Sequence, residues 1–368
     1  MTNYLSNVCV PFTEHNAILR AMVANATWPR PIRVYGYNGQ DMFLGGDLFE
    51  AETDCINTMG QIATSGAHNL AFWAKYAPFN ATAPRGSPSG PLQQPRGKHS
   101  QLNVTYNASK VYVALVYGDM DNINFVQTFG RQHMQRRSSL CFSNISSCFA
   151  LSWTLSPNLI DFSPEMMRWY YAEAKKSDGY DTFIMPPSGT LYAYPGMMPP
   201  DVQQEFVDQQ NDQANVMDST GSVHWEWFFA WHEAFVDYFP RYLAPRHRGV
   251  SSKYFFLNDV PWPVPIPNMW FKGQSYRILR SNASAGSDVV LFAPRFNWQS
   301  GGGGGFNFTA KDVADVLHAL PLGSVQYIYI IQNTDIDQLF SMVNEFLDRD
   351  LVQLVGFEAL AQLAVQRG

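Results

Sequence analysis

The sequence predicts an α/β protein built around a parallel sheet, and its length and repetition favour a TIM-barrel-like (β/α) barrel over an open sheet. Strand-like and helix-like segments alternate from residue 109 to residue 368, which is typical of parallel sheets. Hydrophobic residues make up 46% of the 368-residue chain and charged residues only 15%, so the chain can bury a sizeable core. No segment repeats at the period of about 20–50 residues that solenoids and propellers require.

A change in composition divides the chain into three parts. These are a smaller N-terminal α/β domain at residues 1–80, a Pro/Gly-rich linker or loop at 81–108, and the barrel-like domain at 109–368. Pro and Gly are so frequent at residues 81–100 that neither a helix nor a strand can persist there. The first domain is expected to contain a helix at residues 14–26, a strand at 32–37 and a further apolar segment at 69–76.

The barrel-like domain begins with a continuous apolar run at residues 111–117, which is typical of a strand buried on both faces. Ser163 and Pro164 suit the N-cap and the first position of a helix at residues 164–175. The same patterns predict strands at residues 182–185, 253–257, 289–292, 325–331 and 352–355. They also predict helices at residues 201–216, 311–319, 335–347 and 358–365, and a helix or irregular aromatic segment at 225–238.

Charge and motifs argue against several classes of function. The net charge of -6 and the lack of a basic cluster argue against nucleic-acid binding. The sequence has no apolar run of about 18 residues, so we expect no membrane span. The glycines at 301–305 lack the register of a phosphate-binding loop, and no GxSxG elbow occurs. The eight histidines are scattered and neither pair of cysteines has CxxC spacing, so we expect no metal and no cofactor.

Seven Asn-x-Ser/Thr sequons, against about three expected by chance, indicate a secreted, extracellular and glycosylated protein. Residues 1–11 lack the features of a signal peptide, so export requires one outside this sequence. The seven acceptor residues are Asn25, Asn80, Asn103, Asn107, Asn144, Asn282 and Asn307.

Four cysteines suit an oxidising compartment and allow three pairings, between which the sequence does not decide. A bond between Cys141 and Cys148 is favoured, because the short Ser/Asn-rich turn between them keeps the partners close. That choice leaves Cys9 for Cys55. The alternative is four buried free thiols.

Two carboxylates, Asp119 and Asp121, and the amide of Asn122 follow the predicted strand at 111–117. In a barrel the functional groups lie where the strands end, and two carboxylates at such a place suit acid–base chemistry. The alternative is an Asx turn in which Asp121 or Asn122 caps a helix that begins near Ile123.

A second candidate segment, residues 186–195, follows the predicted strand at 182–185 and contains Tyr192 and Tyr194 among Gly and Pro. Such a loop can present aromatic rings to the faces of sugars, or it can form a rigid turn whose tyrosines pack locally. A third candidate is Glu226, which lies between Trp225 and Trp227. Indoles beside a carboxylic acid can favour its neutral form and can stack on a sugar ring. Arg295, which follows the strand at 289–292, can either point into the same site or cap a loop.

Taken in order, these segments resemble the GxGYxYP family of putative glycoside hydrolases. Residues 189–195 (GTLYAYP) are similar to the family signature, and residues 119–122 (DMDN) are similar to its Asp-Gly-Asp-Asn loop. With residues 151–159, residues 225–227 and Arg295, the resemblance covers most of the chain from about residue 32. It implies a TIM-barrel-like catalytic domain behind a smaller α/β domain, in an extracellular protein that acts on glycans. By position it implies a site made of Asp119, Asp121, Asn122, Tyr192, Tyr194 and Glu226.

Two positions depart from the family pattern. Leu191 stands at the third signature position and Met120 at the second position of the acidic loop, where the family has Gly. Glycine at such places usually supplies a positive φ or lets a ligand approach the backbone. Bulky side chains at these two positions indicate a reshaped or closed pocket. Such a pocket would favour a protein that has lost its enzymatic activity.

The leading hypothesis is therefore a secreted glycoside-hydrolase-like protein with a glycan as its substrate or ligand. Glu226 is the expected acid, with Asp119 or Asp121 as base or nucleophile. Asn122 and Arg295 are expected to bind sugar hydroxyls, and Tyr192, Tyr194 and Trp225 to stack on sugar rings. One alternative is a non-catalytic, self-associating subunit of an extracellular filament or matrix, or a glycan-binding module. Another is an unrelated α/β enzyme with a small-molecule substrate.

Overall fold

The computed structural model describes residues 75–101, 103–190, 193–226, 230–244, 253–259, 268–282, 286–300, 308–331 and 334–368. Of residues 258, 259, 268 and 269 it describes the backbone alone. It also describes the backbone of strands β1 (Ile32–Tyr35) and β2 (Gln61–Thr64), which pair in parallel. The strand expected at residues 32–37 agrees with β1, whereas the helix expected at 14–26 and most of the segment at 69–76 lie outside the described residues.

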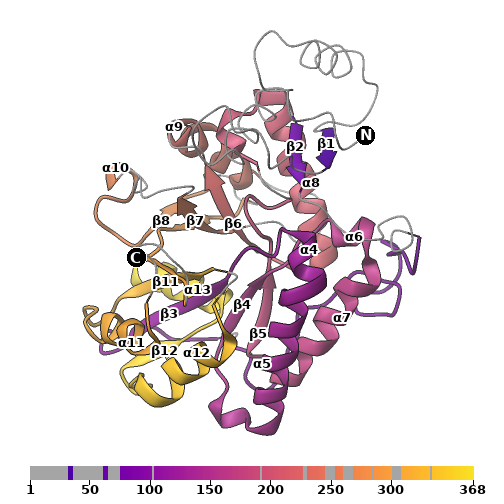
Figure 1. Ribbon diagram of the computed structural model, residues 1–368. Helices are drawn as coiled ribbons and strands as arrows, with labels where there is room; N and C mark the ends of the chain where they lie inside the picture. Colours follow the sequence, from indigo (N-terminus) through magenta and orange to yellow (C-terminus); the bar gives the residue numbers. More distant parts are fainter. Residues whose placement is uncertain are drawn as a thin grey trace, which may run out of the picture.

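Two sheets form the frame of the described chain (Figure 1). The six-stranded sheet has the order β10-β11-β3-β4-β5, with β12 pairing beside the start of β3, and all its strands are parallel. The four-stranded sheet has the order β6-β7-β9-β8, with only β8 antiparallel. The strands are β3 (Val111–Tyr117), β4 (Leu151–Thr154), β5 (Asp181–Ile184), β6 (Gly221–Glu226), β7 (Tyr254–Asp259), β8 (Tyr276–Leu279), β9 (Val289–Phe292), β10 (Asn297–Trp298), β11 (Val325–Ile330) and β12 (Val352–Leu354).

The two sheets approach each other at both edges. A parallel bridge between Met185 and Ser222 connects the end of β5 to β6. Beyond β9 the backbone N–H of Arg295 donates to the carbonyl of Tyr327 in β11, at 2.9 Å. The mixed α/β fold with parallel strands is therefore confirmed. A closed TIM barrel is not found among the described residues, because β5 and β6 are joined only by the bridge between Met185 and Ser222.

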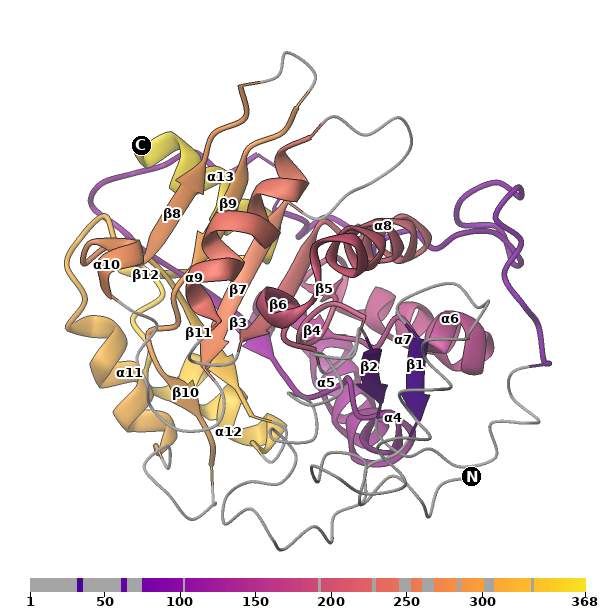
Figure 2. The same ribbon diagram turned by 90° about the horizontal axis from the view of Figure 1, so that it is seen from above.

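The helical segments connect the strands and cover the sheets (Figure 2). The α-helices are α4 (Ile123–Phe125), α5 (Arg131–Ser143), α6 (Leu159–Phe162), α7 (Pro164–Ala174), α8 (Pro200–Met217), α9 (Trp231–Glu233), α10 (Asn268–Phe271), α11 (Ala310–His318), α12 (Ile336–Ser341) and α13 (Phe357–Arg367). The 3-10 and π segments are η2 (Val126–Gly130), η3 (Ile145–Ser147), η4 (Lys175–Ser177), η5 (Pro195–Met197), η6 (Ala234–Tyr238), η7 (Phe239–Leu243) and η8 (Met342–Phe346). No helix among the described residues is long and apolar enough to cross a membrane.

Helix α13 closes the end of the fold at which the strands begin. Its first residue, Phe357, lies so close to Gly221, the first residue of β6, that a Cβ on this glycine would be 2.9 Å from the ring. Side chains of α13 share one hydrophobic core with inward-facing side chains of both sheets, including Val116, Val223 and Tyr329. Because α13 fills the amino ends of the strands, their carboxyl ends remain for a site.

The Pro/Gly-rich segment at residues 81–108 contains no helix or strand where it is described. It packs against the six-stranded sheet through Gln94, whose side chain is buried. The amide of Gln94 donates to the carbonyl of Phe183 at 2.8 Å and accepts from the backbone N–H of the same residue at 2.9 Å. The side chain of Gln94 therefore binds the backbone of β5 in the way that the backbone of a neighbouring strand would.

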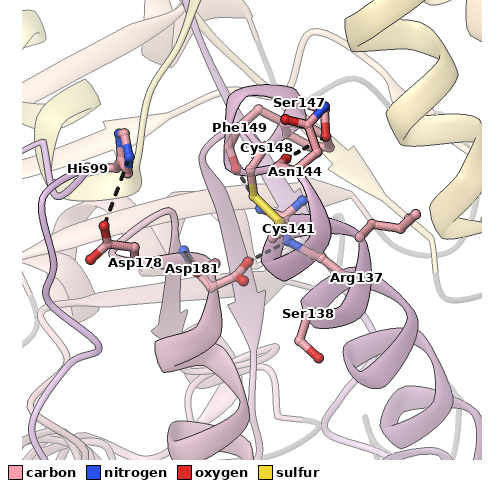
Figure 3. The surroundings of a disulfide bond; sticks show 12 residues. His99, Arg137, Ser138, Cys141, Asn144, Ser147, Cys148, Phe149, Asp178 and Asp181 are labelled. Atoms are coloured by element: carbon pink, nitrogen blue, oxygen red, sulfur yellow. Dashed lines mark hydrogen bonds and ion pairs between the residues drawn. A yellow bond between two sulfur atoms is a disulfide. The ribbon is translucent and has the colours of Figure 1, made fainter.

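A fully buried ion pair joins α5 to β5 beneath a disulfide (Figure 3). The guanidinium of Arg137 donates to Asp181 at 2.5 Å, and the indole N–H of Trp153 donates to the same carboxylate oxygen at 2.9 Å. The disulfide is Cys141–Cys148, as the sequence favours. Cys9 and Cys55 lie outside the described residues. Helix α5 has a polar sequence without a clear apolar stripe, and its buried face includes Arg137, which explains why the sequence does not predict it.

Replacing Arg137 by Met should destabilise the protein by about 3–5 kcal/mol, because Asp181 would remain buried without its cation. The measurement is urea unfolding followed by tryptophan fluorescence. The matched control is Arg136→Met, which removes an exposed arginine from a solvent-exposed pair with Asp337 and should leave the unfolding midpoint unchanged. Equal midpoints for the two variants would contradict the role given to the buried pair.

Candidate functional site

Strand β3 ends in a contact that only glycine permits. Tyr329, the penultimate residue of β11, crosses directly over Gly118. A Cβ at position 118 would lie 2.0 Å from Cζ of this tyrosine ring. The glycine therefore lets the phenol of β11 reach the residues that follow β3.

Asp119 and Tyr329 hold each other through two hydrogen bonds. The Tyr329 hydroxyl donates to Oδ1 of Asp119 at 3.0 Å and accepts the backbone N–H of the same residue at 3.1 Å. The backbone of Asp119 is left-handed, with a φ of 63°, a conformation that costs energy in a residue other than glycine. The interlocked pair offsets that cost and fixes the direction of the carboxylate.

Asp121 completes a cluster of two carboxylates around one phenol. Burial, followed by the charges of Asp119 and Asp121, raises the pKa of Tyr329 well above its ordinary value. The phenol therefore stays protonated and remains a hydrogen-bond donor at neutral pH. Asp121 is fully buried and Asp119 is 9% exposed, so the cluster is shielded from bulk water.

Met120 lies between the two aspartates but does not occupy the site. Its side chain packs into the core between the six-stranded sheet and its helices, with Ile123 and Trp153. Its backbone N–H donates to the Thr154 hydroxyl at 3.3 Å. Positive φ occurs at Asp119 and not at Met120. The bulk of the Met120 side chain is therefore accommodated in this core, whereas Leu191 lies outside the described residues.

Asn122 caps helix α4, as the alternative interpretation of this segment proposes. Its side-chain oxygen accepts the backbone N–H of Phe125 at 3.2 Å, and its backbone is extended. This bond satisfies one of the amide groups that the first turn of a helix leaves without partners. The described contacts of Asn122 thus assign it a structural task.

Helix α8 holds the loop at residues 186–196, called the signature loop below, through a row of buried glutamines. Gln203 donates to the carbonyl of Pro195 at 2.8 Å, Gln210 donates to that of Ser188, and Gln213 accepts the Thr190 hydroxyl at 2.8 Å. Gly189 has a φ of 93°, and any Cβ there would collide with Gln210. The sequence predicts this helix but not its role in holding the loop, for which the signal is Gln at positions 203, 210 and 213 on one helical face.

Ser188 attaches the same loop to β6. Its hydroxyl donates to the carbonyl of Trp225 at 2.7 Å and accepts the backbone N–H of this tryptophan at 2.8 Å. Tyr194 is fully buried in the core that both sheets share, and Trp225, 8% exposed, belongs to that core as well. Tyr192 lies outside the described residues.

Glu226 faces the opposite side of β6 from Trp225. Its carboxylate accepts the backbone N–H of Gly196 in the signature loop at 2.8 Å and lies 3.1 Å from Nε2 of His224. Both side chains are buried, and His224 packs among Trp231, Tyr238 and Phe239. The structure thus places Glu226 in a buried anchor of the loop, and not on the strand face that Trp225 shares with Tyr329.

Arg295 is exposed, and its backbone N–H donates to the carbonyl of Tyr327 in β11. Tyr327 comes two residues before Tyr329 in the same strand. The structure therefore brings the charges of Asp119 and Asp121 together at the Tyr329 phenol, whereas Glu226 binds the backbone of Gly196 and Arg295 that of β11. Among the described residues no group of three or more His, Cys, Asp or Glu side chains could hold a metal ion.

The buried His224 should make stability depend on pH. Burial lowers the pKa of His224 to about 3, whereas an unfolded histidine titrates near about 6.5. Between these values the unfolded chain binds a proton that the folded chain does not, so stability is complete above about pH 6.5 and decreases as the pH falls towards 3. His224→Gln keeps an N–H for Glu226 but does not titrate.

The free energy of unfolding of the wild type should therefore fall more steeply between pH 6.5 and pH 4 than that of His224→Gln, by up to about 1.4 kcal/mol per pH unit. The measurement is urea unfolding at a series of pH values. Carboxylates contribute to the slope of both proteins, so the difference reports the imidazole. Identical slopes would show that His224 is protonated in the folded state.

Comparisons with known proteins bear on the family and on the fold. Residues 109–260 match the model of the "GxGYxYP putative glycoside hydrolase C-terminal domain". A crystal structure of a putative hydrolase from Bacteroides thetaiotaomicron VPI-5482 is similar over 91% of this chain, with a TM-score of 0.65 and 18% identity. At this identity the likeness shows the fold alone, and this chain spans 57% of the length of that protein.

Two further structures are less similar. They are a putative polysaccharide deacetylase from Mycobacterium smegmatis and a 4-alpha-glucanotransferase from Thermococcus litoralis, both 10% identical. The first has a TM-score of 0.45 and covers 73% of this chain and 95% of its own. The second has a TM-score of 0.41 and covers 69% of this chain and 40% of its own. No curated protein matches the sequence. Residues 109–260 of this chain are therefore similar to the C-terminal domain of the GxGYxYP family.

Proposed function

We propose that this protein acts on glycans, and that Asp119 and Asp121 are the reacting pair of a glycoside hydrolase. The observation that carries the proposal is the enclosure of both carboxylates around the Tyr329 phenol at the carboxyl end of β3. A strained backbone at Asp119 and a glycine that no other residue could replace are features that a surface loop does not need. The family match supports the reaction class.

Hydrolysis of a glycosidic bond needs one carboxyl group as acid and another as base or nucleophile. Asp119 suits the second role, because it accepts the Tyr329 hydroxyl and is thereby held as a carboxylate acceptor. Asp121 then protonates the leaving oxygen. The separation of their carboxyl groups would decide the stereochemical course, since it is about 5–5.5 Å in retaining and about 6.5–9.5 Å in inverting enzymes.

Aromatic side chains would bind the sugar. Trp225 shares the inward face of the fold with Tyr329, and the family resemblance assigns the same role to Tyr192, which lies outside the described residues. Aromatic rings offer an apolar face to a sugar and can also carry a polar group. Glu226 contributes by fixing the signature loop through Gly196.

The extracellular location is part of the same proposal. It is supported by the Cys141–Cys148 disulfide, since such bonds persist in oxidising compartments. It is also supported by the sequons, because all five acceptors among the described residues are exposed. These five are Asn80, Asn103, Asn107, Asn144 and Asn282, whereas Asn25 and Asn307 lie outside the described residues.

A non-catalytic descendant that serves as a structural subunit is the second candidate. It is favoured by the complete burial of Asp121, Tyr194 and Glu226, since none of the three side chains lies at the surface. In that case the buried polar groups would serve only to hold the loops together. Activity measurements separate the two candidates.

The first test is hydrolysis of a broad panel of glycans by the wild type, Asp119→Asn and Asp121→Asn. Loss of a group in acid–base catalysis should lower kcat by about 10²–10⁴-fold. The matched control is Asp315→Asn, which removes an exposed carboxylate that pairs with Lys311 on α11, and it should retain wild-type activity. Absence of turnover by the wild type on every glycan, together with defined assemblies in size measurements, would favour the structural subunit.

The second test separates positioning from chemistry. Tyr329→Phe keeps the ring over Gly118 but removes the hydroxyl that orients Asp119, and it should lower kcat by about tenfold with KM little changed. The measurement is steady-state kinetics on the best glycan of the panel. An unchanged kcat would show that Asp119 does not depend on this hydrogen bond.

A further inference from the structure

The disulfide-closed ring at residues 141–148 displays apolar side chains to solvent. Phe142 is 78% exposed, more than any other large hydrophobic side chain among the described residues, and Ile145 is 36% exposed. Exposed apolar groups that lie together usually mark a surface that something covers. The same ring contains the sequon residue Asn144.

The ring is held rigidly on the protein surface (Figure 3). Besides the disulfide, the guanidinium of Arg349 donates to the carbonyls of Ser146 and Cys148, at 3.0 and 3.1 Å. The amide of Asn344 donates to the carbonyl of Ser147 at 3.1 Å. Phe142 and Asn144 are therefore presented on a fixed piece of backbone.

The side chain of Asn144 is oriented for modification. Asn144 is exposed at the end of α5, and its Oδ1 accepts the hydroxyl of Ser146, the third sequon residue, at 2.7 Å. This bond fixes the orientation of the amide whose nitrogen would carry a glycan. Phe142 stands two residues before it, so the two Cα atoms are at most about 7 Å apart.

We propose that Asn144 carries an N-linked glycan whose first sugar packs against the ring of Phe142. The apolar C–H face of a hexose ring matches the face of a phenyl ring, and the contact removes apolar surface of both from water. The occupant of this patch is thus the protein's own glycan. The inference rests on the proposed export of the protein, because the modification is made on exported chains in the secretory pathway.

The modification joins Nδ2 of Asn144 to the anomeric carbon of a sugar supplied by a lipid-diphosphate-linked oligosaccharide. The new bond is N–C1, and the bond that breaks joins C1 to the diphosphate, which leaves with its electron pair. The amide loses one proton, which the departing diphosphate or the solvent takes up. No oxidant or reductant is needed.

Asn107 provides a matched control within the same chain. It is exposed, and its Oδ1 accepts the hydroxyl of Ser109, the third residue of its sequon, at 2.8 Å. Thr105, and not an aromatic residue, stands two positions before it. A glycan at Asn107 should therefore have the same local attachment but no ring to cover.

The test uses the full chain secreted from a eukaryotic host behind a secretion signal, with occupancy measured by glycopeptide mass spectrometry. Asn144 should be occupied. Complete removal of the glycans should lower the melting temperature by about 1–3 °C, whereas trimming to the first sugar should leave it unchanged. Asn144→Gln should reproduce the loss, and Asn107→Gln should not.

The decisive comparison adds Phe142→Ser, a substitution at an exposed position that the fold tolerates. In this background the glycan at Asn144 should no longer affect the melting temperature, so the double variant Phe142→Ser, Asn144→Gln should match Phe142→Ser alone. An unoccupied Asn144 beside other occupied sequons would overturn the inference but leave the extracellular location intact. Absence of glycans at every sequon would overturn both. An Asn144→Gln effect of the same size in the Phe142→Ser background as in the wild type would overturn the packing.

Discussion

The candidate site depends on the close approach of Tyr329 to Gly118. Because the phenol crosses the backbone where β3 ends, position 118 must be glycine, and the hydroxyl can bind both the N–H and the carboxylate of Asp119. The same bonds stabilise the left-handed backbone of Asp119, while Asp121 is buried near the phenol and Met120 is buried in the core between the six-stranded sheet and its helices. The contact between Tyr329 of β11 and Gly118 at the end of β3 thus positions the carboxylate of Asp119, next to which Asp121 lies.

A second layer of buried polar groups holds the signature loop to α8 and β6. Gln210, Ser188 and Glu226 each bind a backbone group, two of them in the loop and one in β6 beside it. Buried polar groups are costly unless they are satisfied, so a network of this kind specifies one conformation of the loop. A site that acts on a substrate needs such rigid support from residues that do not touch the substrate.

The sequence predicts the strands well where an apolar run is continuous, as at residues 111–117 and 289–292, and it predicts the pair Asp119 and Asp121 because they follow such a strand. It misses α5, whose buried face contains Arg137, and the short strand β4. It does not tell which side of β6 Glu226 faces, because that depends on the register in which β6 pairs with its neighbouring strand. The sequence does not identify Tyr329 as a site residue, because in the apolar run of a buried strand it resembles a residue of the core.

The most direct test of the central claim is a crystal structure of Asp121→Asn with an oligosaccharide from the glycan panel. We expect a sugar at the carboxyl end of β3, with its glycosidic oxygen within hydrogen-bonding distance of Asp119 or of the substituted side chain at position 121. The Tyr329 hydroxyl should still bind Asp119. A sugar bound elsewhere, with no contact to either position, would contradict the assignment of the reacting pair.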